Sequence, residues 1–132
     1  MRIKWISPAM ALLVLSGCAG QGVIDAKVEL DARFIYEEEK GDRWRVLPSE
    51  GVVTGDCEDY ALTLREQVGG DIWVVKLTDG SWHAMLCLDG LCADNLGAEW
   101  FVIDPPRYSI LIRYSDEDVQ QKLASLGGAT MP

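Results

Sequence analysis

The chain lacks several features that would fix its class at once. It has a single histidine, and Asp and Glu outnumber Lys and Arg by 21 to 12, giving a formal net charge of −9. Binding to nucleic acid needs a basic face for the phosphates, and none is visible. The first apolar run, from Trp5 to Leu15, is shorter than the roughly 20 residues that span a bilayer. With no repeat or low-complexity tract either, nucleic-acid binders and repeat proteins are disfavoured.

The N-terminus has the three parts of an export signal. Arg2 and Lys4 supply positive charge, an apolar stretch follows, and small residues precede Cys18. The ending Leu15-Ser16-Gly17-Cys18 resembles the bacterial lipoprotein signal, in which the cysteine becomes the lipidated first residue. An ordinary secretory signal with a chance cysteine is the alternative. The resemblance implies a lipoprotein of the bacterial cell envelope that faces the periplasm. Ala19, directly after the cysteine, is similar to the residue found there in lipoproteins sorted to the outer membrane, so we expect that membrane to hold the anchor.

Length and composition indicate one globular domain. Removing residues 1–17 from the 132 leaves 132 − 17 = 115 residues, enough for one compact domain and too few for two. A content of 48% hydrophobic residues with five Trp is globular rather than disordered. We therefore expect a signal peptide over 1–17, a lipid-anchored tether over 18–26 and a domain over 27–132. An N-terminal helix is expected over 25–39.

The second half of the chain carries a strong hairpin signal. Asp89-Gly90 lies between two apolar runs, which predicts a two-residue type I′ turn. In that register Cys87 faces Cys92 as the closer, non-hydrogen-bonded kind of pair, so a disulfide is feasible in an oxidising compartment. A zinc site of His83, Cys87 and Cys92 is the alternative, but it needs two thiolates to survive there. With the first cysteine used by the anchor, Cys57 is the odd thiol.

The residues around Cys57 predict the start of a helix. Asp56 is a favourable N-cap, Asp59 three residues later gives a capping-box pattern, and Gly69-Gly70 ends the helix. Cys57 would then lie in the first turn, where backbone N–H groups and the helix dipole favour a thiolate and can hold an oxyanion. A buried structural cysteine is the competing interpretation, because cysteine is among the most buried residue types.

The single histidine lies on the first strand of the predicted hairpin. His83 shares a face with Met85 and Cys87, and Asp94 faces Met85 from the second strand, diagonal to His83 and within reach. A histidine oriented by a carboxylate is the second half of a Cys-His-Asp arrangement. If the hairpin is looser than a two-residue turn, Asp104 is the rival orienter.

These residues together resemble a known family, the bacterial transglutaminase-like cysteine proteinases. This group includes the periplasmic proteases that release biofilm adhesins. The likeness extends from about Phe34 to Tyr114 and implies Cys57 as nucleophile, His83 as base and Asp94 as orienter, although the broader transglutaminase pattern favours Asp104. The matching runs are Gly55-Asp56-Cys57-Glu58-Asp59-Tyr60-Ala61, His83-Ala84-Met85-Leu86 and Asp94-Asn95-Leu96.

The resemblance implies a papain-like α+β fold, with the cysteine helix packed on an antiparallel sheet. The sequence favours the same class, because β-rich runs separated by turn residues follow the predicted helix. We expect a meander of strands, and Ser115 with Asp118 predicts the capping box of a final helix. The expected strands are 72–77, 82–88, 91–96, 99–103 and 108–114.

The acidic residues beside Cys57 pose an electrostatic question. Asp56, Glu58 and Asp59 should raise the pKa of the thiol. Two explanations are open. Acidic residues are common in the first turn of a helix, or a bound cation offsets their negative charge. By the resemblance, Asp56 and Glu58 hold the places of calcium ligands in the adhesin-processing members, and carboxylates suit calcium.

The expected function is that of a cysteine peptidase. It would cleave a protein or peptide substrate in the envelope through a thioester intermediate. A transamidase or amidase, and a non-catalytic lipoprotein binding module on the same fold, are the alternatives.

Overall fold

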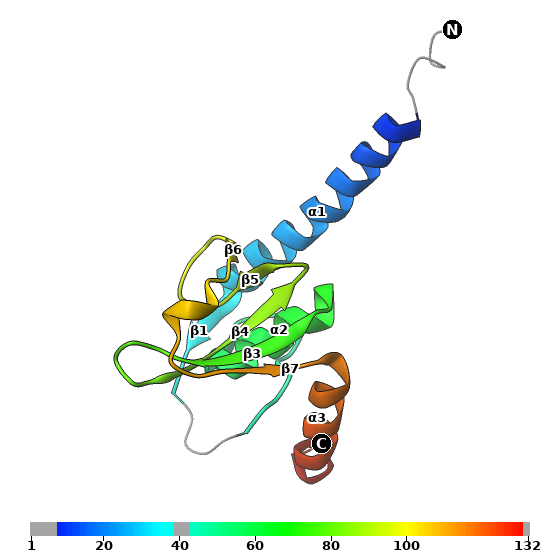
Figure 1. Cartoon of the computed structure of the whole chain (residues 1–132). Coiled ribbons are helices and arrows are strands. Elements are labelled where there is room, and N and C mark those ends of the chain that lie inside the picture. The colour runs from blue at the N-terminus through cyan, green and yellow to red at the C-terminus, as the bar shows by residue number, and fades with distance from the viewer. Residues whose placement is uncertain (1–7, 39–42, 131–132) are drawn as a thin grey trace, which may run out of the picture.

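The computed structural model of the chain describes residues 8–38 and 43–130, with side chains for 20–38 and 43–125. Residues 1–7 of the predicted signal peptide lie outside the described residues, and Cys18 is described by its backbone alone. In chain order (Figure 1), the elements are α1 (Pro8–Arg33), β1 (Phe34–Tyr36), β2 (Val53–Gly55), α2 (Cys57–Val68), β3 (Asp71–Lys76), β4 (Trp82–Leu88), β5 (Leu91–Ala93), β6 (Phe101–Val102), the 3₁₀ turn η2 (Pro105–Arg107), β7 (Leu111–Tyr114) and α3 (Asp116–Thr130).

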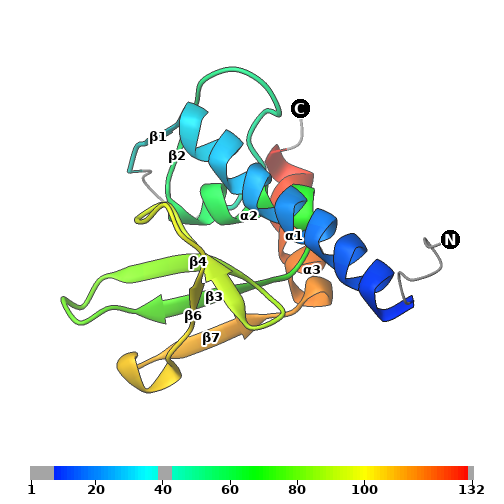
Figure 2. The same ribbon diagram turned by 90° about the horizontal axis from the view of Figure 1, so that it is seen from above.

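Five of the strands form one antiparallel sheet in the order β6-β5-β4-β3-β7. Figure 2 shows the helices gathered on one side of it. The prediction of an α+β fold with helices packed on an antiparallel sheet is confirmed. The expected continuous meander is wrong at its last strand, since β7 pairs with β3, for example Ile112 with Val74. Pro105-Pro106 cannot donate to a ladder, and the chain crosses through η2 to the opposite edge of the sheet.

The N-terminal region differs from the expectation at both ends of its helix. α1 already includes residues 18–26, which were expected to form a tether, and the helix expected over 25–39 ends at Arg33. It ends there because Phe34–Tyr36 pairs in parallel with Val53–Gly55. In the part of the chain that the structure describes, no helix combines the length and apolarity needed to cross a bilayer. The signal peptide and the lipid anchor stay predictions.

Both predicted helix caps form. The Asp56 carboxylate accepts the Asp59 N–H at 3.2 Å, and the Asp59 carboxylate accepts the Asp56 N–H at 3.3 Å, which completes the capping box of α2. Gly69, with φ of 79°, ends the helix as expected. At α3, Ser115 and Asp118 make the same reciprocal pair of hydrogen bonds. Local residue chemistry therefore sets where both helices begin.

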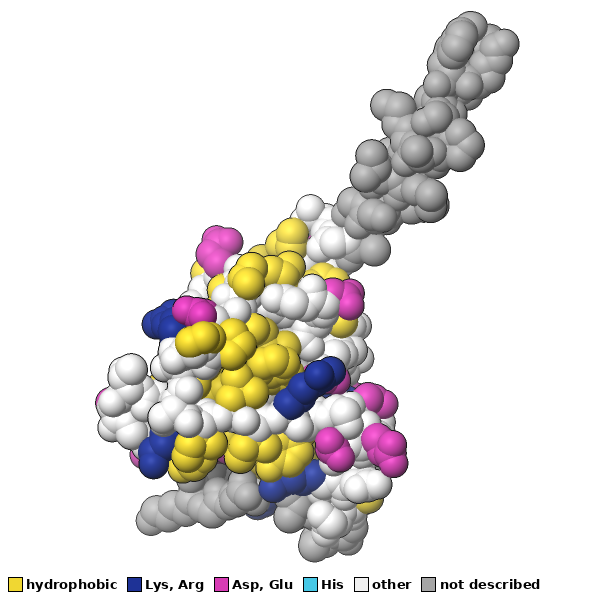
Figure 3. All heavy atoms as spheres, viewed as in Figure 1, with side chains coloured by type: hydrophobic (Ala, Val, Ile, Leu, Met, Phe, Trp, Pro, Cys, Tyr) yellow, Lys and Arg dark blue, Asp and Glu magenta, His cyan; other side chains and the backbone are white. Residues whose placement is uncertain are grey.

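The sheet is packed on both faces. Between the sheet and the helices lies the larger core, whose fully buried members include Leu62, Leu64, Ile72 and Leu86. Burial of each such side chain contributes roughly 1.5–3 kcal/mol. The opposite face carries a smaller cluster, which includes Val75 and is partly covered by the chain around β6 and β7. Figure 3 shows apolar side chains gathered over this face. The helix that begins at Cys57 is thus fixed firmly against the centre of the sheet.

The β4–β5 hairpin forms in the predicted register. Asp89 and Gly90 have φ values of 50° and 86°, the two left-handed positions that a type I′ turn requires. Cys87 faces Cys92, and the two form a disulfide across Cα atoms 4.0 Å apart. The predicted disulfide is confirmed, and the zinc alternative is wrong because both of its thiols are oxidised. The covalent link ties together the two strands that carry His83 and lead into Asp94.

Candidate functional site

Cys57 is the first residue of α2, as predicted. It follows directly on β2, and the chain turns into the helix at Gly55 and Asp56. A Cβ at Gly55 would come within 2.8 Å of the Asp59 side chain, so the glycine lets the capping carboxylate fold back. The Cys57 thiol is half-buried, free of any disulfide, and hydrogen-bonded to the backbone at Ala84. The predicted nucleophile therefore lies at a capped helix end, against β4.

The electrostatic balance at Cys57 differs from the expectation that the helix end would favour a thiolate. Burial, the largest effect, and the charges of Glu58 and Asp56 together bring the pKa of the thiol to about 11. Backbone hydrogen bonds at Ala84 and Glu58 lower the pKa, but they do not offset burial. The resting side chain at neutral pH is consequently a neutral thiol.

The acids beside Cys57 have structural partners of their own. Asp59 is fully buried and accepts hydrogen bonds from both the backbone and the guanidinium of Arg45 at 3.3 Å, while Asp56 serves as the N-cap. Within residues 8–38 and 43–130, no group of three or more His, Cys, Asp or Glu side chains could hold a metal ion. Calcium takes six to eight oxygen ligands, so a site at Asp56 and Glu58 would need further ligands, and it stays a prediction.

His83 and Asp94 form the second half of the site. Imidazole Nε2 lies 2.8 Å from Asp94 Oδ2, and the two residues are only 5% and 8% exposed. Burial acts to raise the pKa of Asp94, but the hydrogen bond and charge of His83, with backbone hydrogen bonds from Leu96 and Gly97, bring it below its ordinary value. Because an ionised carboxylate only accepts, Nε2 carries the proton and Nδ1 is left as the basic nitrogen.

The rival orienter, Asp104, is placed differently. It lies exposed at the start of η2, and its carboxylate makes no capping hydrogen bond there. The contact to His83 comes from Asp94, as predicted, but the expected strand position of Asp94 opposite Met85 is wrong, because β5 ends at Ala93 and Asp94 lies just beyond it. The geometry thus selects Asp94 as the partner of the imidazole.

Near His83, β4 has no neighbouring strand on its β5 side, because β5 is short. β5 pairs with β4 only from Leu86 to Leu88, so β4 has no β5 partner at Ala84. The thiol of Cys57 meets the backbone of Ala84, the residue that follows His83. Among the described residues no hydrogen bond joins this thiol to the imidazole. The structure therefore brings the three predicted residues to one stretch of β4, with the histidine–carboxylate contact made and the thiol beside it.

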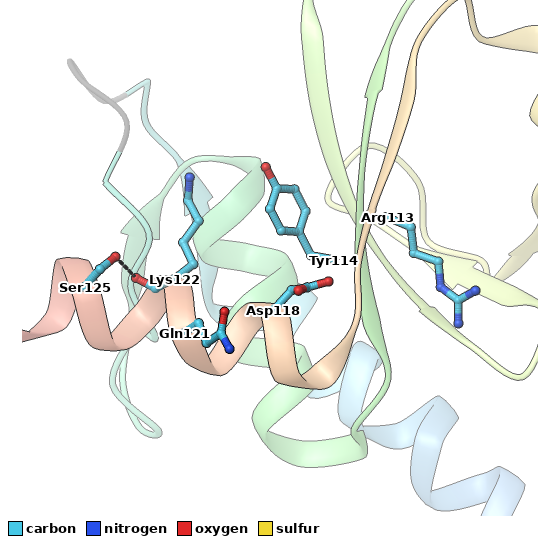
Figure 4. Close-up of a pocket in the computed structure, with 6 residues that line it drawn as sticks. All are labelled: Arg113, Tyr114, Asp118, Gln121, Lys122 and Ser125. Carbon is cyan, nitrogen blue, oxygen red and sulfur yellow. Dashed lines mark hydrogen bonds between the residues drawn. The ribbon is translucent and has the colours of Figure 1, made fainter.

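A pocket of about 290 Å³ lies on the face of the sheet that α2 covers, near the start of that helix. Glu58, next to Cys57, and Trp82, next to His83, line it together with Trp44 and Tyr114. A larger pocket, about 520 Å³, lies between β7 and α3, where Tyr114, Asp118 and Lys122 line it (Figure 4). None of the predicted site residues lines the larger pocket. Of the predicted site residues, Glu58 alone lines the smaller pocket, and Cys57, His83 and Asp94 line neither pocket.

Two residues near the site had no role in the sequence-based prediction. Lys27 on α1 is 1% exposed, and its ammonium contacts Tyr60 of α2 and the loop after Asp94. The i,i+4 spacing of Lys27 and Asp31 is a helix signal in the sequence, but it is more often found on a solvated surface. Tyr60 belongs to the motif around Cys57, yet the motif alone does not reveal its partners. Burial of the lysine is visible only in the fold.

Sequence comparison finds no protein-family model and no curated protein that matches this chain.

Proposed function

We propose that the chain is an exported, lipid-anchored cysteine peptidase of the bacterial envelope, with a papain-like, transglutaminase-like arrangement of its site. Cys57 is the nucleophile, His83 the general base and Asp94 the orienter. The observation that carries the proposal is the buried 2.8 Å contact between His83 and Asp94 beside the backbone that meets the Cys57 thiol. A nucleophile near a base that a third group orients is the arrangement that covalent catalysis uses.

The first half-reaction begins from a neutral thiol. His83 Nδ1 takes the Cys57 proton as Sγ bonds to the carbonyl carbon of the scissile amide, whose oxygen becomes an oxyanion. Asp94 stabilises the imidazolium that forms. The oxyanion collapses, the C–N bond breaks, and the imidazolium returns its proton to the leaving amine. A thioester on Cys57 and a free amine result. Because apo sites are often looser than substrate complexes, the thiol–imidazole contact is assigned to the bound state.

The second half-reaction hydrolyses the thioester. His83 takes a proton from water as the water oxygen attacks the thioester carbon. The C–S bond then breaks, and the imidazolium returns its proton to Cys57 Sγ, which releases a carboxylic acid and regenerates the thiol. The N–H of Cys57, at the first helical position, has no intrahelical acceptor and supplies part of the oxyanion hole. An amine in place of water would give transamidation. We favour hydrolysis because water is the abundant acceptor in the cell envelope.

The 290 Å³ pocket is where we place part of the substrate. Trp82 is half-exposed, and Trp44 and Tyr114 line the same pocket. Aromatic walls near the start of α2 suit an apolar side chain of a substrate. Calcium at Asp56 and Glu58 remains a prediction from the resemblance, and no step of this mechanism uses it.

A second candidate is a non-catalytic binding module on the same scaffold. The observation in its favour is the pKa of Cys57, raised to about 11 by burial and by the neighbouring acids. A thiol that no base deprotonates would leave the aromatic pocket as a recognition surface alone.

The decisive experiment is cleavage of a peptide library at neutral pH. Wild-type protein is expected to release new carboxyl termini, and Cys57→Ala is expected to release none while keeping its circular-dichroism spectrum. The mutant is a matched control because it removes one sulfur atom from the end of a helix that the Asp56–Asp59 capping box still defines. Equal cleavage by both proteins, or no cleavage by wild type, would reject the peptidase in favour of the binding module.

A further inference from the structure

Lys27 is a buried cation with three polar partners on three parts of the chain. Its Nζ lies 2.8 Å from Asp31 on the same helix, 3.0 Å from the hydroxyl of Tyr60 on α2, and 2.6 Å from the carbonyl oxygen of Gly97. Nζ also lies 5.4 Å from the centre of the Tyr60 ring. A lysine that is 1% exposed is costly to bury unless it is paired in this way.

The Gly97 contact links the lysine to the orienting carboxylate. Gly97 closes the short loop that begins at Asp94, and the Asp94 carboxylate accepts the Leu96 N–H at 3.0 Å and a backbone hydrogen bond at Gly97. Asp94 has left the sheet at this point, because the β5 ladder ends at Ala93. The loop that holds the carboxylate is therefore fixed by Lys27 instead of by strand pairing.

The Tyr60 contact links the same lysine to the cysteine helix. Tyr60 lies one turn after Cys57, is fully buried, and donates its hydroxyl to Asp31. After burial and Asp31, the charge of Asp94 also contributes to raising the pKa of Tyr60, which shows that this hydroxyl and Asp94 are close enough to interact. One ammonium group thus joins α1, the helix of the nucleophile and the loop of the orienter.

We infer that Lys27 is a positioning residue that sets the place of Asp94, and through it His83, by holding the Gly97 carbonyl. The inference rests on the proposed function for its catalytic meaning. It also makes α1, the helix that would lead from the lipid anchor, a part of the site's architecture.

If Lys27 only stabilised the fold, substitutions at Lys27 and Tyr60 should have the same effect, because both residues belong to one buried network. Of the two, however, it is Lys27 that hydrogen-bonds to the Asp94 loop, whereas the Tyr60 hydroxyl hydrogen-bonds to Lys27 and Asp31. Tyr60→Phe removes one hydroxyl and leaves the lysine and Gly97 in place. Lys27→Met removes the ammonium and keeps the length of the side chain. The pair separates loss of stability from loss of position.

The readout is the imidazole itself. The chain has a single histidine, so NMR of the full-length protein assigns the His83 Nε2–H without ambiguity. In wild type this proton is expected to be shifted downfield and protected from exchange with water by Asp94. Lys27→Met is expected to speed its exchange by about ten-fold or more, and Tyr60→Phe to leave it unchanged while lowering the melting temperature. If a peptide substrate is found, Lys27→Met should lower kcat on the order of 100-fold with little change in KM.

Either of two results overturns the inference: an Nε2–H signal in Lys27→Met that matches wild type, or an equal loss of protection in Tyr60→Phe. Should Lys27→Met not fold by circular dichroism, Lys27→Gln carries the test in the other direction. Its amide can still donate to the Gly97 carbonyl, so the Nε2–H should keep most of its protection, and exchange about ten-fold faster or more in a folded Lys27→Gln would overturn the inference. The NMR result does not depend on turnover. A protein that cleaves no peptide but shows the Lys27 effect refutes the peptidase and keeps the positioning role.

Discussion

The histidine side and the cysteine side of the candidate site are held by different interactions and stand in different charge states. His83 and Asp94 lie at the end of a disulfide-linked hairpin, and their mutual contact lowers the pKa of Asp94 in spite of burial. Cys57 begins a helix, and there burial and neighbouring acids raise the pKa of the thiol to about 11. The orienting carboxylate is ionised at rest, whereas the nucleophile is not.

This difference indicates which catalytic strategy the site can use. A preformed thiolate–imidazolium pair needs surroundings that lower the pKa of the cysteine. Here they raise it, so in the proposed mechanism the proton would leave the thiol during the attack, and the imidazole aligned by Asp94 would accept it. The following predictions separate the two sides, beginning with the largest expected effect.

Removing the charge of Asp94 should disable the histidine side. In Asp94→Asn the amide can donate to Nε2 and favour the wrong tautomer, so we expect kcat to fall by about 10³-fold or more. Asp104→Asn is the matched control and should stay within about two-fold of wild type, because its carboxylate does not contact the imidazole. Peptide cleavage rates measure both. A larger loss in Asp104→Asn would transfer the orienting role to that residue.

Removing the disulfide should destabilise the hairpin that carries His83 without changing the reactivity of Cys57. Cys87→Ser combined with Cys92→Ser opens a short covalent loop, and we expect the free energy of unfolding to fall by about 2 kcal/mol, roughly 30-fold in the unfolding equilibrium. Urea titration measures it. The pH profile of Cys57 alkylation should be unchanged, because the bridge lies on the β4–β5 hairpin and not on α2. A shifted profile would show that the two sides are coupled.

Alkylation should report the protonated thiol on the cysteine side. A thiol whose pKa is raised from 9.0 to about 11 holds less thiolate at neutral pH, and its rate keeps rising with pH until about 11. The higher nucleophilicity of the thiolate offsets part of this loss, so we expect iodoacetamide to modify Cys57 about ten-fold more slowly than a free cysteine at pH 7.

Peptide mapping by mass spectrometry distinguishes Cys57 from Cys18 in that measurement. Glu58→Gln removes a charge that raises the pKa and should speed the reaction modestly. Alkylation of Cys57 faster than of a free cysteine at pH 7 would instead indicate a preformed thiolate.

The sequence was most informative where local rules decide structure. The capping box at Asp56, the turn at Asp89-Gly90 and the facing cysteines all follow from spacing and turn chemistry. The contact of His83 with Asp94 was predicted from the same hairpin, although Asp94 lies just beyond its second strand. Each depends on residues that are close in the chain or directly opposed across one hairpin.

The sequence was least informative where burial or long-range pairing decides. β7 joins β3 at the far edge of the sheet, because pairing partners distant in sequence are not encoded by any local pattern. The pKa of Cys57 depends on how deeply α2 packs, which outweighs the helix dipole that the motif suggests. Lys27 was missed for the same reason, since a lysine in a charged helix looks solvated until the fold encloses it.

The central claim is that Cys57 forms a covalent acyl intermediate with a base supplied by His83. Its most direct test is capture of the thioester: wild-type protein is mixed with a cleaved peptide, quenched in acid within milliseconds to seconds, and mapped by mass spectrometry. We predict an adduct on Cys57 whose added mass is that of the amino-terminal product less one water, and none in His83→Ala. Cleavage without any adduct on Cys57, or an adduct that forms equally fast in His83→Ala, would contradict the account.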